Sequence, residues 1–279
     1  MRIVVLTSGG RTAPQILRTL HRRGVVPEAV VVATYSRLSD CFHHPGGPQR
    51  VREIPLVPLR AIWRRLRPRF RSDLRLGRRL VVTSTLNSDQ MRCDLARLAP
   101  DLLVLAGCRL ITPAVIQTAA MGVVNVHPGL LPWLRNNGVV GNAIARGLPV
   151  GVTVHRVDPG IDTGPVIRRK LIAVSGTERT LETLETAADQ AAADLLAQVV
   201  FDAQTTGVLP PGERQTSRFP LCHWLSAEKR RVVDQAVAAG RAAELFAEWL
   251  PKVAPGSLEL PPTLGLETDA SVDKLSGPA

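Results

Sequence analysis

The stretch PDLLVLAGCRLITPAVIQTAAMGVVNVHPG, residues 100–129, holds two continuous apolar runs, DLLVLAG (101–107) and GVVNVH (122–127). Runs of this length and composition predict buried strands. Working outward toward the N-terminus, three similar runs predict three more strands: RIVVLT (2–7), AVVVAT (29–34) and LVVTS (80–84). Continuous β-branched runs are typical of a parallel sheet that is buried on both faces.

Amphipathic helices are expected between these strands. One is predicted over Thr12 to Arg23, and another over Ser88 to Leu98, where Ser88 has the chemistry of a helix cap. Together the elements predict an α/β fold, a Rossmann-like, mostly parallel sheet with helices on both faces and right-handed crossovers. Such sheets bind ligands at the carboxyl ends of their strands. Asn125 and His127 stand at that end of the 122–127 strand.

The second half of the chain alternates less regularly. A short helix is predicted over 138–146. Two strands are predicted over 151–157 and 165–174, joined by DPGIDTG (158–164), and a long helix over 178 to about 203. We expect a catalytic domain over 1–206 and a short helical C-terminal appendage over 207–254. Its helices are predicted near 227–239 and 242–250. The Pro-, Gly-, Ser- and Thr-rich residues 255–279 are expected to be a disordered tail.

Composition points to an intracellular globular enzyme. The 279 residues are 45% hydrophobic, enough for a buried core, yet no run of about twenty uncharged apolar residues predicts a membrane span. In the N-terminal MRIVVLTSGG the apolar stretch is too short for the hydrophobic region of a signal peptide, and a small-residue cleavage site is lacking, so we expect a first strand instead. The four cysteines lack metal-ligand or disulfide spacing, so we expect no metal site and a cytoplasmic location.

The net charge of +11 is concentrated in one segment. A basic insertion at about 60–79, from Arg60 to Arg79, holds nine arginines and a single acid, Asp73. Such a segment suits a membrane surface or an acidic ligand, and it suits equally a solvated insertion with a few apolar anchors. We favour the solvated insertion and expect no DNA partner.

Two short motifs carry the chemistry: Asn125-Val126-His127-Pro128 at a strand end, and Asp162-Thr163-Gly164-Pro165 in a downstream loop. Their order and spacing resemble the 10-formyltetrahydrofolate-dependent formyltransferases. That family includes glycinamide ribonucleotide, methionyl-tRNA and nucleotide-linked amino-sugar formyltransferases. The resemblance takes in residues 100–107 and extends more weakly from residue 1 to about 200. It implies that Asn125, His127 and Asp162 are catalytic.

The residue types agree with that implication. Transfer of a formyl group to an amine passes through a tetrahedral intermediate with an anionic oxygen, to which the amide of Asn125 can donate. His127 points the same way as Asn125, because the two are two residues apart on a strand. It can hold that oxygen as imidazolium or move the proton that the amine loses. Asp162 would favour the charged imidazole or accept the amine proton through water. Both proton routes stay open.

The resemblance also implies where the folate donor binds. In the family the pterin lies against the backbone of a strand-to-loop segment, and a second loop closes the other side. Here the first segment runs from Leu105 to Ile111, and the second is the loop around Asp158 to Asp162. The implied donor-binding residues are Leu105, Gly107, Cys108, Arg109, Leu110, Ile111 and Asp158.

The binding site for the acceptor amine is less well marked. The turn Ser8, Gly9, Gly10 and Arg11 follows the first strand and opens a helix, so its N–H groups suit a phosphate. Arg135 lies where relatives carry an aromatic-Arg-Gly sequence, but Asn136 and Asn137 separate it from Gly138. We therefore treat Ser8 to Arg11 and Arg135 as candidate acceptor-binding residues. His155, on the 151–157 strand, is expected to be structural or to contact the acceptor.

Three functions remain in competition. We expect N-formylation of a small amine, possible examples being a nucleotide-linked amino sugar or a precursor of a specialised metabolite, with 10-formyltetrahydrofolate as donor. Methionyl-tRNA formylation fits the basic charge, but that branch carries a C-terminal β-barrel where this sequence is helical. A non-catalytic folate-binding or interaction module is the third. A homodimer through the C-terminal helices is left open.

Overall fold

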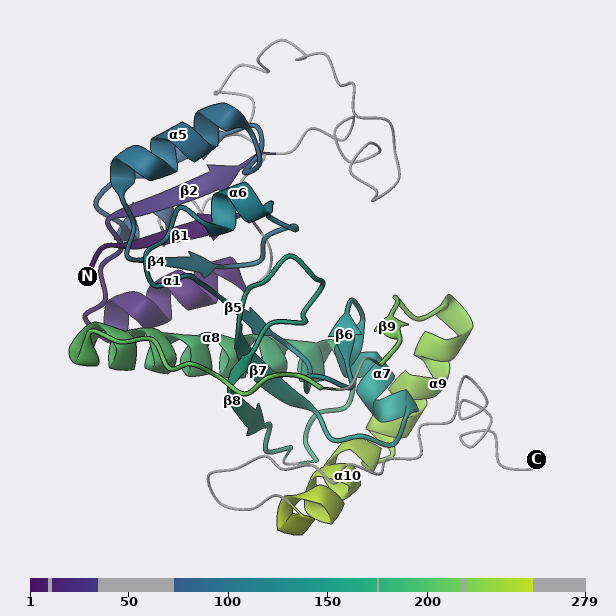
Figure 1. The fold of residues 1–279 in the computed structure, drawn as a ribbon. Coiled ribbons are helices and arrows are strands. Elements are labelled where there is room, and N and C mark those ends of the chain that lie inside the picture. Colours follow the sequence, from purple (N-terminus) through teal and green to yellow (C-terminus); the bar gives the residue numbers. More distant parts are fainter. Residues whose placement is uncertain (10–11, 35–72, 175, 217–218, 253–279) are drawn as a thin grey trace. The chain divides into compact units, whose positions relative to one another are not determined.

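A computed structural model of the chain describes residues 1–9, 12–34, 73–174, 176–216 and 219–252 (Figure 1). They form two compact units. The first is Met1–Asn125 with Val200–Leu209, and the second is Val126–Val199 with the described part of Pro210–Ala279. Most of the basic insertion and all of the predicted tail lie outside the described residues. The domain limits expected at 206 and 254 stay a prediction.

The first unit is built on parallel strands, each formed by one of the apolar runs. They are β1 (Ile3–Thr7), β2 (Ala29–Ala33), β3 (Leu80–Thr83), β4 (Leu102–Leu105) and β5 (Val123–His127). All residues of β1, β2 and β4 are buried, as a sheet covered on both faces requires. The strands pair in the order β3-β2-β1-β4-β5, and β5 continues into the second unit at Val126.

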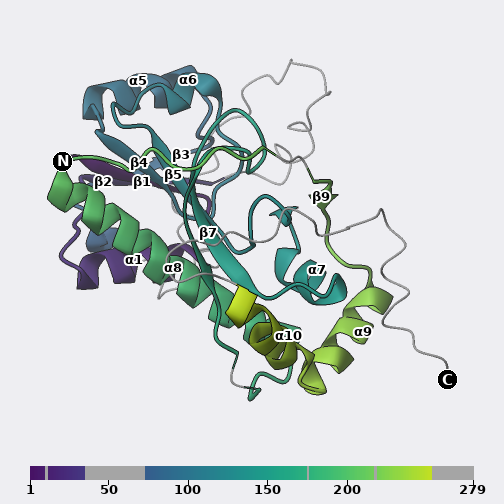
Figure 2. The ribbon, with the colours of Figure 1, turned by 60° about the horizontal axis from the view of Figure 1, so that its bottom comes forward.

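Helices cover both faces of this sheet. They are α1 (Ala13–Arg22), α5 (Asp89–Leu98) and α6 (Pro113–Ile116), with a 3-10 turn η1 (Leu74–Leu76). Figure 2 shows α5 and α6 on one face and α1 on the other. The predicted cap of α5 is confirmed, because the hydroxyl of Ser88 accepts the N–H of Met91 at 3.1 Å.

The second unit contains the shorter elements. Its strands are β6 (Arg135–Asn136), β7 (Gly151–Arg156), β8 (Val166–Leu171) and β9 (Leu221–Cys222). Its helices are α7 (Val139–Ala145), α9 (Ala227–Ala238) and α10 (Arg241–Trp249), with the turn η2 (Leu250–Lys252); α8 (Leu181–Thr206) continues into the first unit. β7 and β8 are antiparallel, whereas β6 and β9 form a separate parallel pair. The complete order β3-β2-β1-β4-β5-β7-β8 confirms the predicted α/β fold.

Element ends differ from the predicted ones for local reasons. Helix α8 begins at Leu181 rather than residue 178, because the hydroxyl of Thr180 accepts the N–H of Thr183 at 3.2 Å and caps the helix. It runs on to Thr206 and stops where Gly207 adopts a φ of 72°. Strand β8 ends at Leu171, since its partner Gly151 is the first residue of β7. The pair β6–β9 was not predicted.

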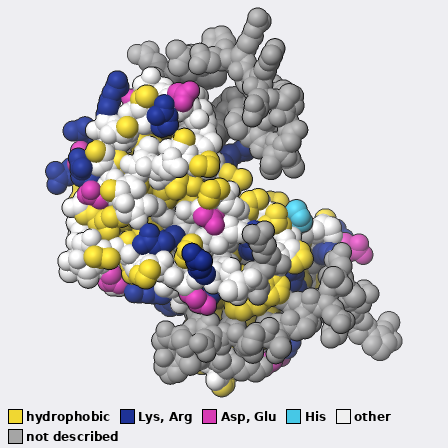
Figure 3. All heavy atoms as spheres, in the orientation of Figure 1, with side chains coloured by type: hydrophobic (Ala, Val, Ile, Leu, Met, Phe, Trp, Pro, Cys, Tyr) yellow, Lys and Arg dark blue, Asp and Glu magenta, His cyan; other side chains and the backbone are white. Residues whose placement is uncertain are grey.

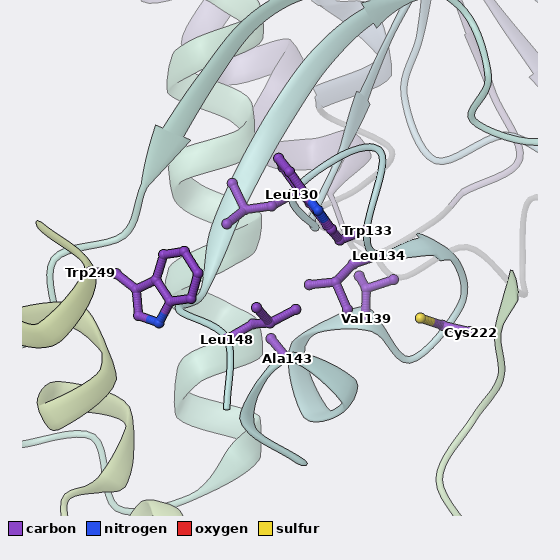
Figure 4. Close-up of a cluster of buried hydrophobic side chains, with 8 residues drawn as sticks. All are labelled: Leu130, Trp133, Leu134, Val139, Ala143, Leu148, Cys222 and Trp249. Atoms are coloured by element: carbon purple, nitrogen blue, oxygen red, sulfur yellow. The ribbon is translucent and has the colours of Figure 1, made fainter. Parts of the chain in front are cut away.

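A cluster of apolar side chains joins the turn after β5 to α7 and the C-terminal elements (Figure 4). Its members are Leu130, Trp133, Leu134, Val139, Ala143, Leu148, Cys222 and Trp249. Trp249 comes from α10 and is 4% exposed, which means that this predicted C-terminal helix packs into the core of the second unit. The cluster fixes the backbone on either side of residue 135.

Charged side chains are spread over the surface. On the face shown in Figure 3, Lys and Arg side chains lie in several separate groups among apolar and uncharged ones. None of the helices described is long and apolar enough to cross a membrane.

Candidate active site

The carboxyl ends of β1, β4 and β5 bring several predicted residues together in the first unit. The N–H of Ser8 donates to the carbonyl of Gly107 at 3.2 Å. Asn125 lies opposite Leu105 in the register of β5 on β4 and is half-buried. These contacts follow from parallel strands ending at one edge of a sheet. Of the turn expected to suit a phosphate, Gly10 and Arg11 lie outside the described residues.

The Leu105–Ile111 segment leaves β4 as a loop with a fixed backbone. Asn87 holds it at two points, donating to the carbonyl of Leu110 at 2.9 Å and accepting the N–H of Thr112 at 2.9 Å. The side chain of Leu110 is 54% exposed, whereas Ile111 is buried. Burial raises the pKa of Cys108 to about 12, so its thiol stays neutral and is no nucleophile. The segment offers an apolar side chain beside immobilised peptide groups.

His127 is the last residue of β5 and is 4% exposed. Its Nε2 lies 2.6 Å from the carbonyl oxygen of Leu134, which can only accept, so Nε2 carries a hydrogen. Gly129 leaves room for this bond, because a Cβ there would stand 2.9 Å from both atoms. Thr153 fixes the turn by donating to the carbonyl of Gly129 at 2.8 Å. The ring of His127 is therefore fixed by its Nε2, and Nδ1 points away from the Leu134 carbonyl.

The loop 158–164 joins β7 to β8 and carries Asp162. A Cβ on Gly164 would lie 1.9 Å from the carbonyl oxygen of Arg156, so only glycine fits at the neck of this hairpin. Asp162 has a φ of 52°, a left-handed conformation that Asp tolerates better than most residues. Asp158 orders the other half of the loop by accepting from the hydroxyl of Thr163 at 2.6 Å.

Three groups converge on the carboxylate of Asp162. Its Oδ2 lies 3.5 Å from Nδ1 of His127 and accepts the N–H of Asn136 at 2.9 Å, while its Oδ1 lies 3.6 Å from Nε2 of His155. Burial by itself would raise the pKa of Asp162. Four neighbouring groups outweigh this effect of burial and hold the pKa of Asp162 below the usual 3.8: His127, His155, the Asn136 N–H and Arg135. Asp162 is thus a carboxylate at neutral pH, and the structure brings it to His127 as predicted.

His155, on β7, is a second buried histidine at this carboxylate. Its Nδ1 lies 2.8 Å from the carbonyl oxygen of Arg156 and therefore carries the hydrogen of the neutral ring. Burial lowers the pKa of His155, and the nearby His127 adds to this, although Asp162 opposes it. Neutral His155 presents an unprotonated Nε2 to Asp162.

Three side chains or backbone groups position the loop 158–164. Asn136 and Gln215 were not identified from the sequence, and Arg135, expected to bind the acceptor, binds backbone carbonyls. Arg135 donates from Nε and Nη2 to the carbonyl of Ile161 at 2.9 and 2.7 Å, and from Nη1 to the carbonyl of Phe219 at 3.3 Å. Its acceptor-binding role stays a prediction. Asn136 and Gln215 also bind the loop, and only the unusual Asn136-Asn137 insertion hinted at this in the sequence.

A pocket of about 690 Å³ opens beside this loop within the second unit. It is lined by Arg135, Asp158, Gly160, Thr163, Pro165, Arg214 and Gln215. Its lining is polar and carries two cations and one carboxylate, which suits a polar or anionic small molecule. Within the described ranges no group of three or more His, Cys, Asp or Glu side chains could hold a metal ion.

Comparison with known proteins gives one family and several relatives. The family model described as formyl transferase matches residues 1–200. A phosphoribosylglycinamide formyltransferase of Bacillus subtilis is 44% identical over 87 residues, covering 30% of this chain and 44% of the relative. A methionyl-tRNA formyltransferase of Corynebacterium aurimucosum is 30% identical over 201 residues, covering 67% and 60%. The chain thus spans about half the length of these curated relatives.

Among solved structures, a sugar N-formyltransferase from a Shewanella species is similar over most of both chains. It has a TM-score of 0.56 at 16% sequence identity, with 85% of this chain and 88% of that chain covered. A likeness at this identity concerns the fold.

Proposed function

This chain belongs to the formyl transferase family, and we propose that it transfers a formyl group from 10-formyltetrahydrofolate to the amine of a small molecule. The observation that carries the proposal is the carboxylate of Asp162, on a loop with a fixed backbone, whose oxygens lie 3.5 Å from Nδ1 of His127 and 3.6 Å from Nε2 of His155. Asn125 stands two residues before His127 on β5, so the two side chains leave the strand on the same side. This is the set of groups that formyl transfer needs.

The residues divide the work as follows. The donor supplies an N-formyl carbon, and the amine forms a C–N bond to it while the bond to the donor nitrogen breaks. Asn125 donates its amide N–H to the oxygen that becomes anionic. Asp162, through His127 or a water, takes the proton that the attacking amine loses, and His127 returns a proton to the departing nitrogen. The Leu134 carbonyl holds Nε2 of His127, so that Nδ1 faces the carboxylate of Asp162.

The Leu105–Ile111 segment fits a folate. Its backbone is clamped by Asn87, and the apolar Leu110 is exposed beside it, so peptide groups can bind the edge of a pterin while an apolar surface covers its face. Asp158, on the loop 158–164, stays a further proposed donor-binding residue. Leu105, Gly107, Cys108, Arg109 and Ile111 complete the proposed donor site.

We propose an anionic acceptor, of the class of nucleotide-linked amino sugars. The pocket beside loop 158–164 supports this, because Arg214 is exposed at its lining and a phosphate needs a cation. Ser8 and Gly9, at the end of β1, stay candidate acceptor-binding residues, although their N–H groups donate to the Gly107 carbonyl and the Thr7 hydroxyl in this structure. The likeness in fold to a sugar N-formyltransferase is consistent with this class.

A screen of amine acceptors tests the proposal. The chain would be incubated with 10-formyltetrahydrofolate and a panel of amines, and products would be read by a mass increase of one formyl group. We expect formylation of nucleotide-linked amino sugars, and turnover at least about a hundredfold lower with Asp162→Asn. Formate release without any formylated amine would instead indicate donor hydrolysis, and donor binding without turnover would indicate a folate-binding module.

Methionyl-tRNA is the second candidate acceptor. The relative from Corynebacterium aurimucosum and the net charge of +11 favour it. The described residues after Gly207 form helices α9 and α10 and the two-residue strand β9, which supports the small acceptor instead. Charged initiator tRNA belongs in the same screen, and its formylation in preference to every small amine would decide for this candidate.

A further inference from the structure

The described residues 210–216 and 219–222, which together we call the strap, follow the residues matched by the family model, and Glu213 pairs with the hairpin that carries Asp162. Glu213 exchanges two backbone hydrogen bonds with Val166, both of 2.7 Å. Phe219 packs on Trp133, with ring centroids 6.3 Å apart. Leu221 and Cys222 then form β9 against β6. The strap is thus fixed at both of its ends.

Between these anchors, Gln215 reaches the loop 158–164. Its Nε2 donates to the carbonyl of Asp162 at 3.0 Å and to the carbonyl of Gly164 at 2.6 Å. Both partners can only accept, so the orientation of the amide is unambiguous. Oε1 of Gln215 is buried and has no hydrogen-bond partner among the residues that the structure describes, and such an acceptor costs about 1–3 kcal/mol. The stabilising contribution of this side chain therefore comes from the two hydrogen bonds that Nε2 donates.

One of those two bonds lies directly after the strained residue of the loop, Asp162. Asp162 has a φ of 52°, and the preceding carbonyl, that of Ile161, is held by Arg135. Gln215 holds the next carbonyl, so the peptide groups on both sides of the Asp162 side chain are fixed from outside the loop. Without the Gln215 donors, two partly buried carbonyls lose their partners and the backbone can relax out of the left-handed region.

We infer that Gln215 is a positioning residue, which holds the carboxylate of Asp162 against His127 for the proposed formyl transfer. Among the described residues, both hydrogen bonds of the Gln215 side chain go to backbone oxygens, so we assign its effect on the reaction to Asp162. A displacement of about 1 Å at a reacting group can cost roughly a hundredfold in rate. The strap therefore completes the active site from outside the residues that the family model matches.

Gln215→Met tests this inference, because it removes both N–H donors and keeps the length of the side chain. We expect kcat to fall roughly 10- to 100-fold while KM for the donor changes less than about twofold. Thr216→Val is the matched control, an exposed neighbour on the strap, and should keep kcat within about twofold. Circular dichroism and thermal unfolding verify that both variants are folded.

A double-mutant cycle shows whether Gln215 acts through Asp162. In an Asp162→Asn background, Gln215→Met should lower kcat by less than about threefold, because the carboxylate that it positions is gone. A loss as large as in the wild type would overturn the inference.

A second readout needs no turnover. The groups that face Asp162 are His127 on β5, His155 on β7 and Arg135 on β6. If Gln215→Met lets the carboxylate leave them, the pKa of Asp162 rises, and a carbon-13 NMR titration of its carboxyl detects the change. An unchanged titration would overturn the inference. A shifted titration in a chain that formylates no amine would support the inference and contradict only the proposed function.

Discussion

At the scale of single residues, the site depends on a carboxylate kept in an unusual environment. Asp162 is 15% exposed at its side chain and adopts a positive φ, yet its pKa lies below the usual value because two histidines and a backbone N–H face it. The same side chain in an ordinary turn would be solvated and would have no such partners. Its sequence position, in a loop rich in Asp, Pro and Gly, is compatible with either state.

We expect Asn125→Ala and Asp162→Ala each to lower turnover at least about a hundredfold with the fold intact. The first removes an oxyanion donor, and the second removes the proton acceptor beside His127. Steady-state rates, with circular dichroism of each variant, give the measurement. Asp89→Ala, at a side chain that is 96% exposed, is the control and should match the wild type. Near-normal turnover in either site variant would remove that residue from the mechanism.

His155 should make stability fall on the acid side of neutrality. Its pKa in the folded chain lies below 6.5, so below pH 6.5 the unfolded chain takes up a proton that the folded chain does not. The free energy of unfolding then decreases as pH falls, by at most about 1.4 kcal/mol per pH unit for one proton. Denaturant unfolding between pH 7.5 and 5 should show a steeper decline for the wild type than for His155→Gln. Parallel curves would show that His155 is not buried and neutral.

At the scale of elements, the sequence predicted what depends on continuous patterns. The five apolar runs form β1 to β5, and Ser88 caps α5, because burial and capping leave local signals. The pair β6–β9 left none, since a two-residue strand has no periodicity. The partners of Arg135 and Gln215 are backbone carbonyls 26 to 84 residues away, and a carbonyl has the same chemistry at every position. The sequence pointed to His127 and Asp162 as candidate site residues, but it gave no indication of the hydrogen bonds that position them.

Arg135 gives the prediction for the β6 element. Arg135→Gln removes the charged donors from the carbonyls of Ile161 and Phe219, which should lower the free energy of unfolding by about 1.5–3 kcal/mol and turnover about tenfold. Arg179→Gln is the control: its Nη1 donates to one carbonyl, that of Ala238, from an exposed position, and a change within about 0.5 kcal/mol is expected. Equal losses in the two variants would show that Arg135 is no more than a surface arginine. Weaker binding of acceptor with unchanged stability would restore it as an acceptor ligand.

At the scale of the whole molecule, the excess of positive charge is the main feature without an assigned role. The chain carries 35 Lys and Arg against 24 Asp and Glu, and nine of the arginines fall within 60–79. A field of that sign attracts polyanions without distinguishing them and weakens as salt is added. It is thus compatible with both proposed acceptors.

A charge-reducing variant tests whether the basic segment serves catalysis. Replacing Arg64, Arg65, Arg67 and Arg69 by glutamine should leave turnover on a small soluble amine within about twofold, because a solvated insertion does not contact the reacting groups. Rates at low and at high salt, together with binding to anionic vesicles, provide the measurement. A collapse of turnover, or vesicle binding that only the wild type shows, would assign a functional partner to the segment.

The hydrogen bond from Gln215 to Asp162 also has a consequence for the order of events during synthesis. The two residues are 53 positions apart. A ribosome that adds about 5–20 residues per second therefore completes the loop 158–164 roughly 3–10 s before it adds Gln215. During that interval the nascent chain already carries His127 and Asp162, but the amide that fixes the loop does not yet exist. A chain still being translated is accordingly expected to gain activity late, after the strap has emerged.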